Sequence, residues 1–316
     1  MDPNSAVIIG FGLGVGILVG MTGIGGGSLM TPLLILVVGT PPVTAVGTDL
    51  AYGAVTKTVG GYKHWRQKTV DMKLSTWMAF GSVPAAVGGV VVLEILQREL
   101  GSDLTPLLIS VLAVVILLTG VVTLIRAIFL KQLVLKERET LTLARRSKTA
   151  AVLIGVVVGF MLGVTSAGSG ALIALALILV FRLVPQRVVG TDVFHAAVLL
   201  WAAGIAHIVA GNVDYALAGT ILLGSVPGVW VGSHLSVRLP AGTLRTILGV
   251  VLVGAGLGLA SKAGAPIPPY VIAGAPAIIG VLVIYERFRD RVRREDADTE
   301  AQTSAGPIET TSLLRR

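Results

Sequence analysis

Residues 20–27 read Gly-Met-Thr-Gly-Ile-Gly-Gly-Gly, and a related stretch, Gly-Val-Thr-Ser-Ala-Gly-Ser-Gly, occupies residues 163–170, which is 143 positions later. The same offset, without a gap, aligns Gly47-Thr48-Asp49 with Gly190-Thr191-Asp192. It also aligns the Gly-Ser-Val-Pro stretches at 81–84 and 224–227. A single offset that serves several motifs indicates an internal duplication. The chain is therefore predicted to contain two copies of one module.

The remainder of the chain is strongly apolar. Of its 316 residues, 54% are hydrophobic and 13% are charged, and the mean hydropathy is +0.87. A soluble domain is about 25% charged, so this chain has too few polar groups to cover a water-facing surface. Long apolar runs are typical of membrane spans, and we expect an all-α polytopic membrane protein. The expected segments are 5–22, 24–40, 43–62, 74–97, 104–130, 149–165, 167–183, 187–210, 215–236, 243–261 and 267–285.

Basic stretches orient these segments. Lysine and arginine cluster at 57–73, at 131–148 and at 287–294, and such clusters favour the cytoplasmic side. The N-terminus is then outside, the C-terminus is cytoplasmic, and the protein crosses the cell (plasma) membrane many times. Each copy holds five segments, an odd number, so the copies are predicted to be inverted repeats. The expected parts are a first repeat (1–130), a basic linker (131–148), a second repeat (149–261), an extra segment (262–285) and a disordered tail (286–316).

The glycine-rich signature at 20–27, followed by Pro32 and by Gly47-Thr48-Asp49, resembles the TauE/SafE family of sulfite exporters, also called the 4-toluene sulfonate uptake permease family. The resemblance covers the whole hydrophobic body. It implies transport of sulfite, sulfonates or other small organic anions. Many members of that family have a serine where this chain has Asp49 and Asp192, which indicates a subgroup with another substrate or another coupling ion.

The two glycine-rich stretches are the predicted substrate site. Glycine costs about 1 kcal/mol per residue in a helix, so each stretch should interrupt its helix, and the first helix should restart near Ser28. A helix N-terminus presents free N–H groups and a positive dipole end, which attract anions. The alternative is that these glycines only allow close helix crossing. The predicted substrate-binding residues are Thr22, Gly23, Gly25, Gly26, Gly27, Ser28, Thr48, Thr165, Ser166, Gly168, Ser169, Gly170 and Thr191.

Several ionisable residues are candidates for coupling or gating. A carboxylate inside a membrane segment costs at least about 2.5 kcal/mol and normally faces a cavity or a partner, so Asp49 and Asp192 can carry a proton or coordinate Na⁺; the alternative is that they stabilise nearby helix starts. His195 lies one turn after Asp192 and can form a proton relay or a packing pair. Lys57 either pairs with a charge or extends to the interface. The remaining candidates, His64 and His207, occupy equivalent positions of the two copies.

These features favour a secondary active anion transporter with no cofactor. Its partners are a small anionic substrate, the lipid bilayer and a coupling H⁺ or Na⁺. An anion channel needs the same site without alternating access. A membrane scaffold or sensor would need an output domain, and an intramembrane enzyme would need a nucleophile with a base or a metal set. The absence of cysteine excludes thiolate chemistry and disulfides. We expect no nucleic-acid partner, because the basic residues lie between apolar spans. We expect no metal site, because the four histidines include no close i, i+4 pair, and no nucleotide site, because the glycines at 12–16 lie inside an apolar span.

Overall fold

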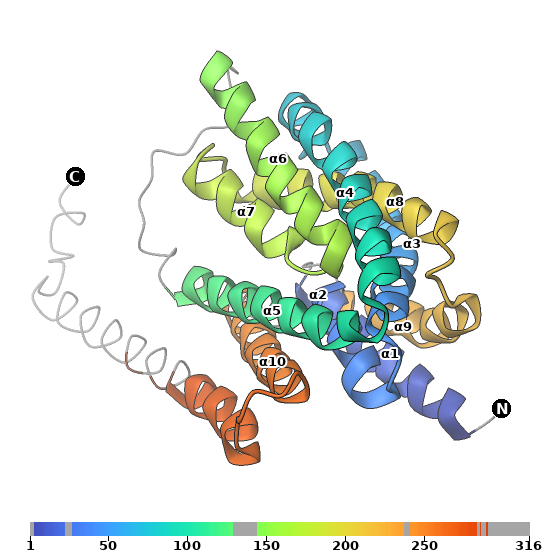
Figure 1. Ribbon diagram of the computed structural model, residues 1–316. Coiled ribbons are helices and arrows are strands. Elements are labelled where there is room, and N and C mark those ends of the chain that lie inside the picture. The colour runs from blue at the N-terminus through green and yellow to red at the C-terminus, as the bar shows by residue number, and fades with distance from the viewer. Residues whose placement is uncertain are drawn as a thin grey trace, which may run out of the picture.

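The computed structural model describes residues 3–22, 27–128, 144–236 and 241–282, together with residues 285 and 289. Within these residues the secondary structure is helical, with no β-strand (Figure 1). The predicted all-α fold is confirmed. The linker at 131–143 and almost all of the tail from 286 lie outside the described residues.

The first half of the chain contains five helical stretches in the predicted order. Each predicted run has its helix, and the second run continues as a π-helix after its α-helical start. The elements are α1 (Pro3–Thr22), α2 (Gly27–Leu33), the π-helix η1 (Leu34–Val38), α3 (Pro42–Arg66), α4 (Met72–Leu100), the 3₁₀ turn η2 (Gly101–Asp103) and α5 (Leu104–Ile128).

The second half repeats this order. A last helix, Pro269–Leu282, follows the repeat in the place predicted for an extra segment. The elements are α6 (Arg145–Thr165), α7 (Ser169–Leu179), α8 (Pro185–Val209), α9 (Tyr215–Ser236) and α10 (Ala241–Lys262).

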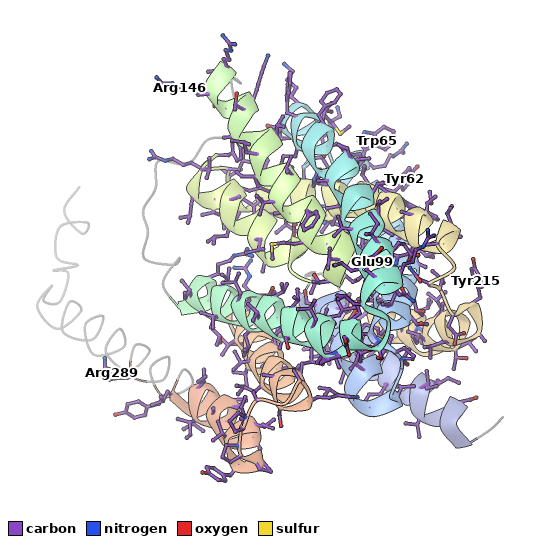
Figure 2. All side chains as sticks on the ribbon, viewed as in Figure 1. Tyr62, Trp65, Glu99, Arg146, Tyr215 and Arg289 are labelled. Carbon is purple, nitrogen blue, oxygen red and sulfur yellow. The ribbon has the colours of Figure 1, made fainter. Side chains whose placement is uncertain are left out.

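Five stretches are long and apolar enough to cross a membrane. The first combines α4 and α5 with the turn between them, and the others are α6, α8, most of α9 and α10. Aromatic side chains are exposed near the end of α3, where Tyr62 and Trp65 project outward (Figure 2). Such residues are typical of the boundary between lipid and water. The protein is therefore a multi-pass membrane protein.

Glycines set two long helix contacts, between α1 and α9 and between α4 and α6. A Cβ on Gly12 of α1 would lie 2.6 Å from the Ile221 carbonyl oxygen, and a Cβ on Gly16 would overlap the backbone of Ser225. Both contact positions increase together, so α1 and α9 run in the same direction. The contact of α4 with α6 repeats this geometry, because every one of these positions has its counterpart 143 residues away. Small residues let membrane helices approach in this way.

In two further contacts, a helix of the first half packs against the equivalent helix of the second half. Helix α5 packs along α10 (Figure 1), and α3 packs along α8. On α3, Gly53 faces Leu200 and Gly60 faces Val193. The α8 positions fall as the α3 positions rise, so the two helices run in opposite directions. Trp201 Nε1 donates a hydrogen bond of 2.8 Å to Thr58 Oγ1, and these two residues are themselves 143 positions apart.

Candidate functional site

One of the two predicted helix interruptions lies in described residues. Helix α1 is described as far as Thr22 and α2 from Gly27 onward, and the predicted first interruption lies between them, outside the described residues. Gly23, Gly25 and Gly26 lie outside the described residues, and the side chain of Thr22 is not described.

The second interruption is described in full. Helix α6 ends at Thr165, and α7 begins at Ser169, followed by Gly170. Between them Ser166 has a φ of 58° and Gly168 a φ of 90°, both left-handed. A serine in this conformation is strained relative to glycine, and the turn stops α6 without a proline.

Helices α2 and α7 meet inside the bundle. The Gly168 amide, at the start of α7, donates a hydrogen bond of 3.3 Å to Ser28 Oγ, among the first described residues of α2. Both residues are buried. Segments from different halves of the chain therefore lie side by side, and α7 brings its positive dipole end to this interior region.

Asp49 lies at this junction, fully buried in the second turn of α3. Its Oδ2 accepts hydrogen bonds from Thr31 Oγ1 at 2.6 Å and from Ser166 Oγ at 2.8 Å. Its Oδ1 has no hydrogen-bond partner among the described residues. A buried acceptor without a partner is costly, so this oxygen marks a place for a proton or another donor. The sequence analysis missed Thr31, although it lies only one helical turn after Ser28.

Asp192, the counterpart of Asp49, has a different environment. The residues equivalent to Ser166 and Thr31 are Gly23 and Ala174, which carry no hydroxyl group. The charges that act on Asp192 are those of Lys57 and Arg126. Lys57 is 8% exposed and lies inside the bundle, and this burial favours an interior charge partner over extension to the interface.

Thr48 and Thr191 each contact the residue that precedes a helix of the other half of the chain. Thr48 Oγ1 accepts the backbone N–H of Asp214 at 3.0 Å, and Thr191 Oγ1 accepts that of Asp71 at 2.9 Å. Each bond anchors the beginning of a helix in the other half of the chain, α9 or α4. Thr165 is buried and donates to the Met161 carbonyl at 2.6 Å. Thr165 Oγ1 also accepts the backbone N–H of Ala167 at 3.3 Å, within the second interruption, and the side chain of Ser169 is not described.

The histidines also connect helices or turns. Both ring nitrogens of His195 contact serine hydroxyls of α4, Nδ1 with Ser75 at 3.3 Å and Nε2 with Ser82 at 3.1 Å. The predicted Asp192–His195 pair is therefore replaced by a bridge between α8 and α4.

His64 and His207 each contact a residue five positions later. His64 Nδ1 lies 3.0 Å from Thr69 Oγ1, and His207 Nδ1 lies 3.3 Å from Asn212 Nδ2. His207 Nε2 also reaches the Gly163 carbonyl oxygen at 3.0 Å, close to the end of α6. Both histidines therefore contact turns that follow their helices, and His207 also contacts the end of α6.

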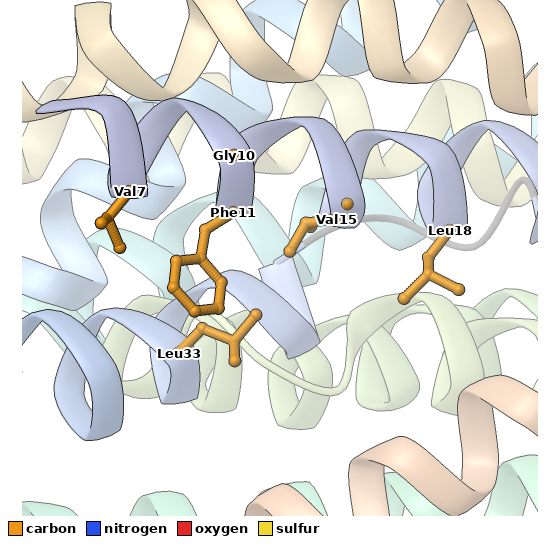
Figure 3. Close-up of a pocket in the computed structure, with 7 residues that line it drawn as sticks. Val7, Gly10, Phe11, Val15, Leu18 and Leu33 are labelled. Carbon is orange, nitrogen blue, oxygen red and sulfur yellow. The ribbon is translucent and has the colours of Figure 1, made fainter.

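An open apolar pocket of about 520 Å³ lies along α1 (Figure 3). Its lining is Val7, Gly10, Phe11, Gly14, Val15, Leu18 and, from α2, Leu33. Such a lining suits acyl chains and offers no donor to an anion, so the pocket is separate in chemistry from the junction at Asp49. Among the described residues no group of three or more His, Asp or Glu side chains is placed to hold a metal ion.

Comparison with known proteins identifies relatives of this chain. The family model described as "Sulfite exporter TauE/SafE" matches residues 8–259. The Probable membrane transporter protein YjnA of Bacillus subtilis (strain 168) is 42% identical over 81% of this chain and 99% of its own length. From the same organism, the Probable membrane transporter protein YdhB is 29% identical over 77% of this chain and 95% of its own length. No solved structure matches the chain.

Proposed function

The chain belongs to the sulfite exporter TauE/SafE family of membrane transporters, and we propose that it is a secondary active transporter of small anions such as sulfite, sulfonates or related organic acids. The proposal depends on one observation, the enclosed polar junction at which α2, α7 and Asp49 meet. Burying polar donor groups inside an apolar bundle is costly, and apolar side chains would fill the same space better. The donor groups therefore point to a function other than packing.

Two inverted repeats are the architecture we propose for transport. Helix α4 runs with α6, and the paired ends of α4 and α8, Asp71 with Thr191 and Glu94 with Asn212, give those two helices one direction. The equivalent contacts give α1, α9 and α3 one direction. Because α3 opposes α8, α1 opposes α6. This supports opposite orientations for the repeats, 1–130 and 149–261, with the junction between them as in other secondary transporters.

The same relations support the proposed orientation. The N-terminus is outside, and the linker 131–148 and the tail 286–316 are cytoplasmic, with the segment 262–285 as an addition to the second repeat. The basic loop between α3 and α4 then lies on the cytoplasmic side and the turn at 210–214 on the outer side.

We propose that the anion is held by the Gly168 amide, Ser28 Oγ and the neighbouring donors of the junction, and that Asp49 carries the coupling proton. A carboxylate at this junction, beside the positive end of α7, repels an anion when ionised and donates to it when protonated. Substrate and proton would therefore enter together. Na⁺ is the alternative coupling ion, bound at the unpartnered Asp49 Oδ1.

An anion channel is the second candidate, because an enclosed anion site also occurs in channels. Asp49 is fully buried, and its Oδ2 is bound by the hydroxyl groups of Thr31 and Ser166. This closed arrangement favours a transporter, since a conducting pore must stay hydrated along its length.

Uptake in proteoliposomes tests the proposal. Purified protein would be supplied with labelled sulfite, a sulfonate, sulfate and a carboxylate, each with and without an imposed proton gradient. We expect accumulation of at least one anion above its external concentration when the gradient is present. Asp49→Asn should abolish the response to the gradient, whereas Asp103→Asn, a change in an exposed turn, should preserve it.

Two results would overturn the proposal. Movement that only ever equalises the concentrations across the membrane would indicate a channel. If Asp49→Asn accumulates substrate at the normal rate with an unchanged pH dependence, Asp49 is not the coupling residue.

A further inference from the structure

Arg126 is a cation in the apolar helix α5, and neither the glycine motifs nor the repeat explains it. It is 5% exposed, and its Nε and Nη1 have no hydrogen-bond partner among the described residues. A buried guanidinium group normally has its donors occupied. An arginine with unfilled donors inside a bundle is therefore set to receive an acceptor from elsewhere.

Lys57 and Asp192 lie in the same interior region. On α3, Gly53, Lys57 and Gly60 share one helical face, and the glycines of that face contact α8 at Leu200 and Val193. Lys57 thus faces α8 next to Asp192, which is 4% exposed. The charges of Lys57 and Arg126 both act on Asp192, yet Asp192 Oδ1 has no hydrogen-bond partner among the described residues. The charge of Arg245 also acts on Arg126, so three cations and one carboxylate leave a net positive charge, and Nε and Nη1 of Arg126 have no partner among the described residues.

A row of polar side chains on α5 extends from this cluster toward the junction at Asp49. Thr119, Thr123 and Arg126 recur every three or four residues along one face of α5, and all three are buried. Thr119, the first residue of this row, lies next to the second helix interruption, because a Cβ on Gly168 would lie 3.4 Å from Thr119 Oγ1. Arg126 is seven residues further on, roughly 10 Å along the helix axis.

Resting on the proposed anion transport, we propose that Arg126 and Lys57 form a second anion-binding site, toward the cytoplasmic end of α5, and that the nearby Asp192 carboxylate opposes anion binding there. The ligand class is a small oxyanion, since a guanidinium fork and an ammonium group both donate to oxygen. Substrate fills the donors of Arg126 that have no partner among the described residues, and the negative charge of Asp192 limits its affinity. The repeat does not duplicate this pair of charges. The residue equivalent to Lys57 is Leu200, and the residue equivalent to Asp192 is Asp49. Asp49 therefore has no equivalent cation, and the two sides of the transporter differ chemically.

Equilibrium binding to the purified full chain tests this inference, with sulfite and methanesulfonate as probes in isothermal titration calorimetry. Arg126→Gln should weaken binding roughly 10-fold or more, as expected for one lost charge-assisted hydrogen bond in a buried site. Asp192→Asn should do the opposite and tighten binding several-fold, because the competing carboxylate is gone. The double variant should bind as weakly as Arg126→Gln alone. Arg66→Gln, at an exposed position, is the control and should bind as the wild type does.

The outcomes separate this inference from the proposed function. If the wild type binds an anion and Asp192→Asn binds it equally or more weakly, the opposing role of Asp192 is wrong, while anion transport stands. If Arg126→Gln is folded and binds normally, the second site is wrong. If Arg126→Gln does not fold, Asp192→Asn alone decides. A wild type that binds and transports none of the anions overturns both proposals.

Discussion

Replacing Gly81 of α4 with alanine should destabilise the protein, although alanine is the better helix former. A Cβ at this position would overlap the Val152 carbonyl oxygen of α6 and lie 3.0 Å from Val156 N. The atoms in the way belong to backbone, so no side chain can rotate aside. The two helices must separate, and overpacking of this kind costs about 1–3 kcal/mol.

Gly88 of the same helix supplies the control. Nothing lies within 4 Å of a Cβ built there, so Gly88→Ala should gain about 0.5–1 kcal/mol from helix propensity. The two alanine variants differ from each other by position alone. Their stabilities should therefore differ by roughly 1.5–4 kcal/mol in opposite directions from the wild type.

Thermal unfolding of detergent-solubilised protein measures this difference. Gly81→Ala should melt several degrees below the wild type and Gly88→Ala at or above it. The second half offers a repeat of the experiment, since a Cβ on Gly224 would overlap the Ile9 carbonyl oxygen of α1 and one on Gly219 would meet nothing. Equal melting temperatures for Gly81→Ala and Gly88→Ala would refute the close contact of α4 with α6.

Two further changes test individual contacts. His195→Ala should lower stability by about 2 kcal/mol or more, because Ser75 and Ser82 lose a buried partner, and it should leave the pH profile of transport unchanged; a shifted profile would instead restore a proton-relay role. Lys262→Met removes the 2.6 Å hydrogen bond from Lys262 Nζ to the Ile35 carbonyl, which is worth about 1.5–3 kcal/mol. Backbone amides of the π-helix should then exchange with deuterium faster than in the wild type. The same amides should exchange more slowly in Lys262→Arg than in Lys262→Met. Equal rates in wild type and Lys262→Met would show that the contact does not hold the π-helix.

Local chemistry made much of this fold predictable. Apolar runs predict helices by their length, and the stretch around Gly168 interrupts a helix, as expected from the cost of glycine there. The helix order therefore follows from the chain itself. The same reasoning could not foresee the π-helix at Leu34–Val38, whose geometry depends on contacts with α10, including Lys262.

The candidate site was less predictable because it depends on helix pairing. Thr48 and Thr191 have the residue type and spacing of substrate contacts, yet each hydroxyl anchors a helix of the other half. Lys57 lies inside only because α3 packs on α8. Arg126 did carry a signal, since it is the one charged residue within the apolar run at 104–130, and an ionisable residue within a membrane segment is by default a functional candidate.

The opposite orientation of the two repeats is the central claim, and cysteine accessibility tests it most directly. The chain has no cysteine, so single variants need no altered background. Met72 and Tyr215 are equivalent first residues of α4 and α9, and they are 42% and 66% exposed. In intact cells a membrane-impermeant maleimide should label Tyr215→Cys and should label Met72→Cys only after lysis. Labelling of both residues from the same side would contradict the account.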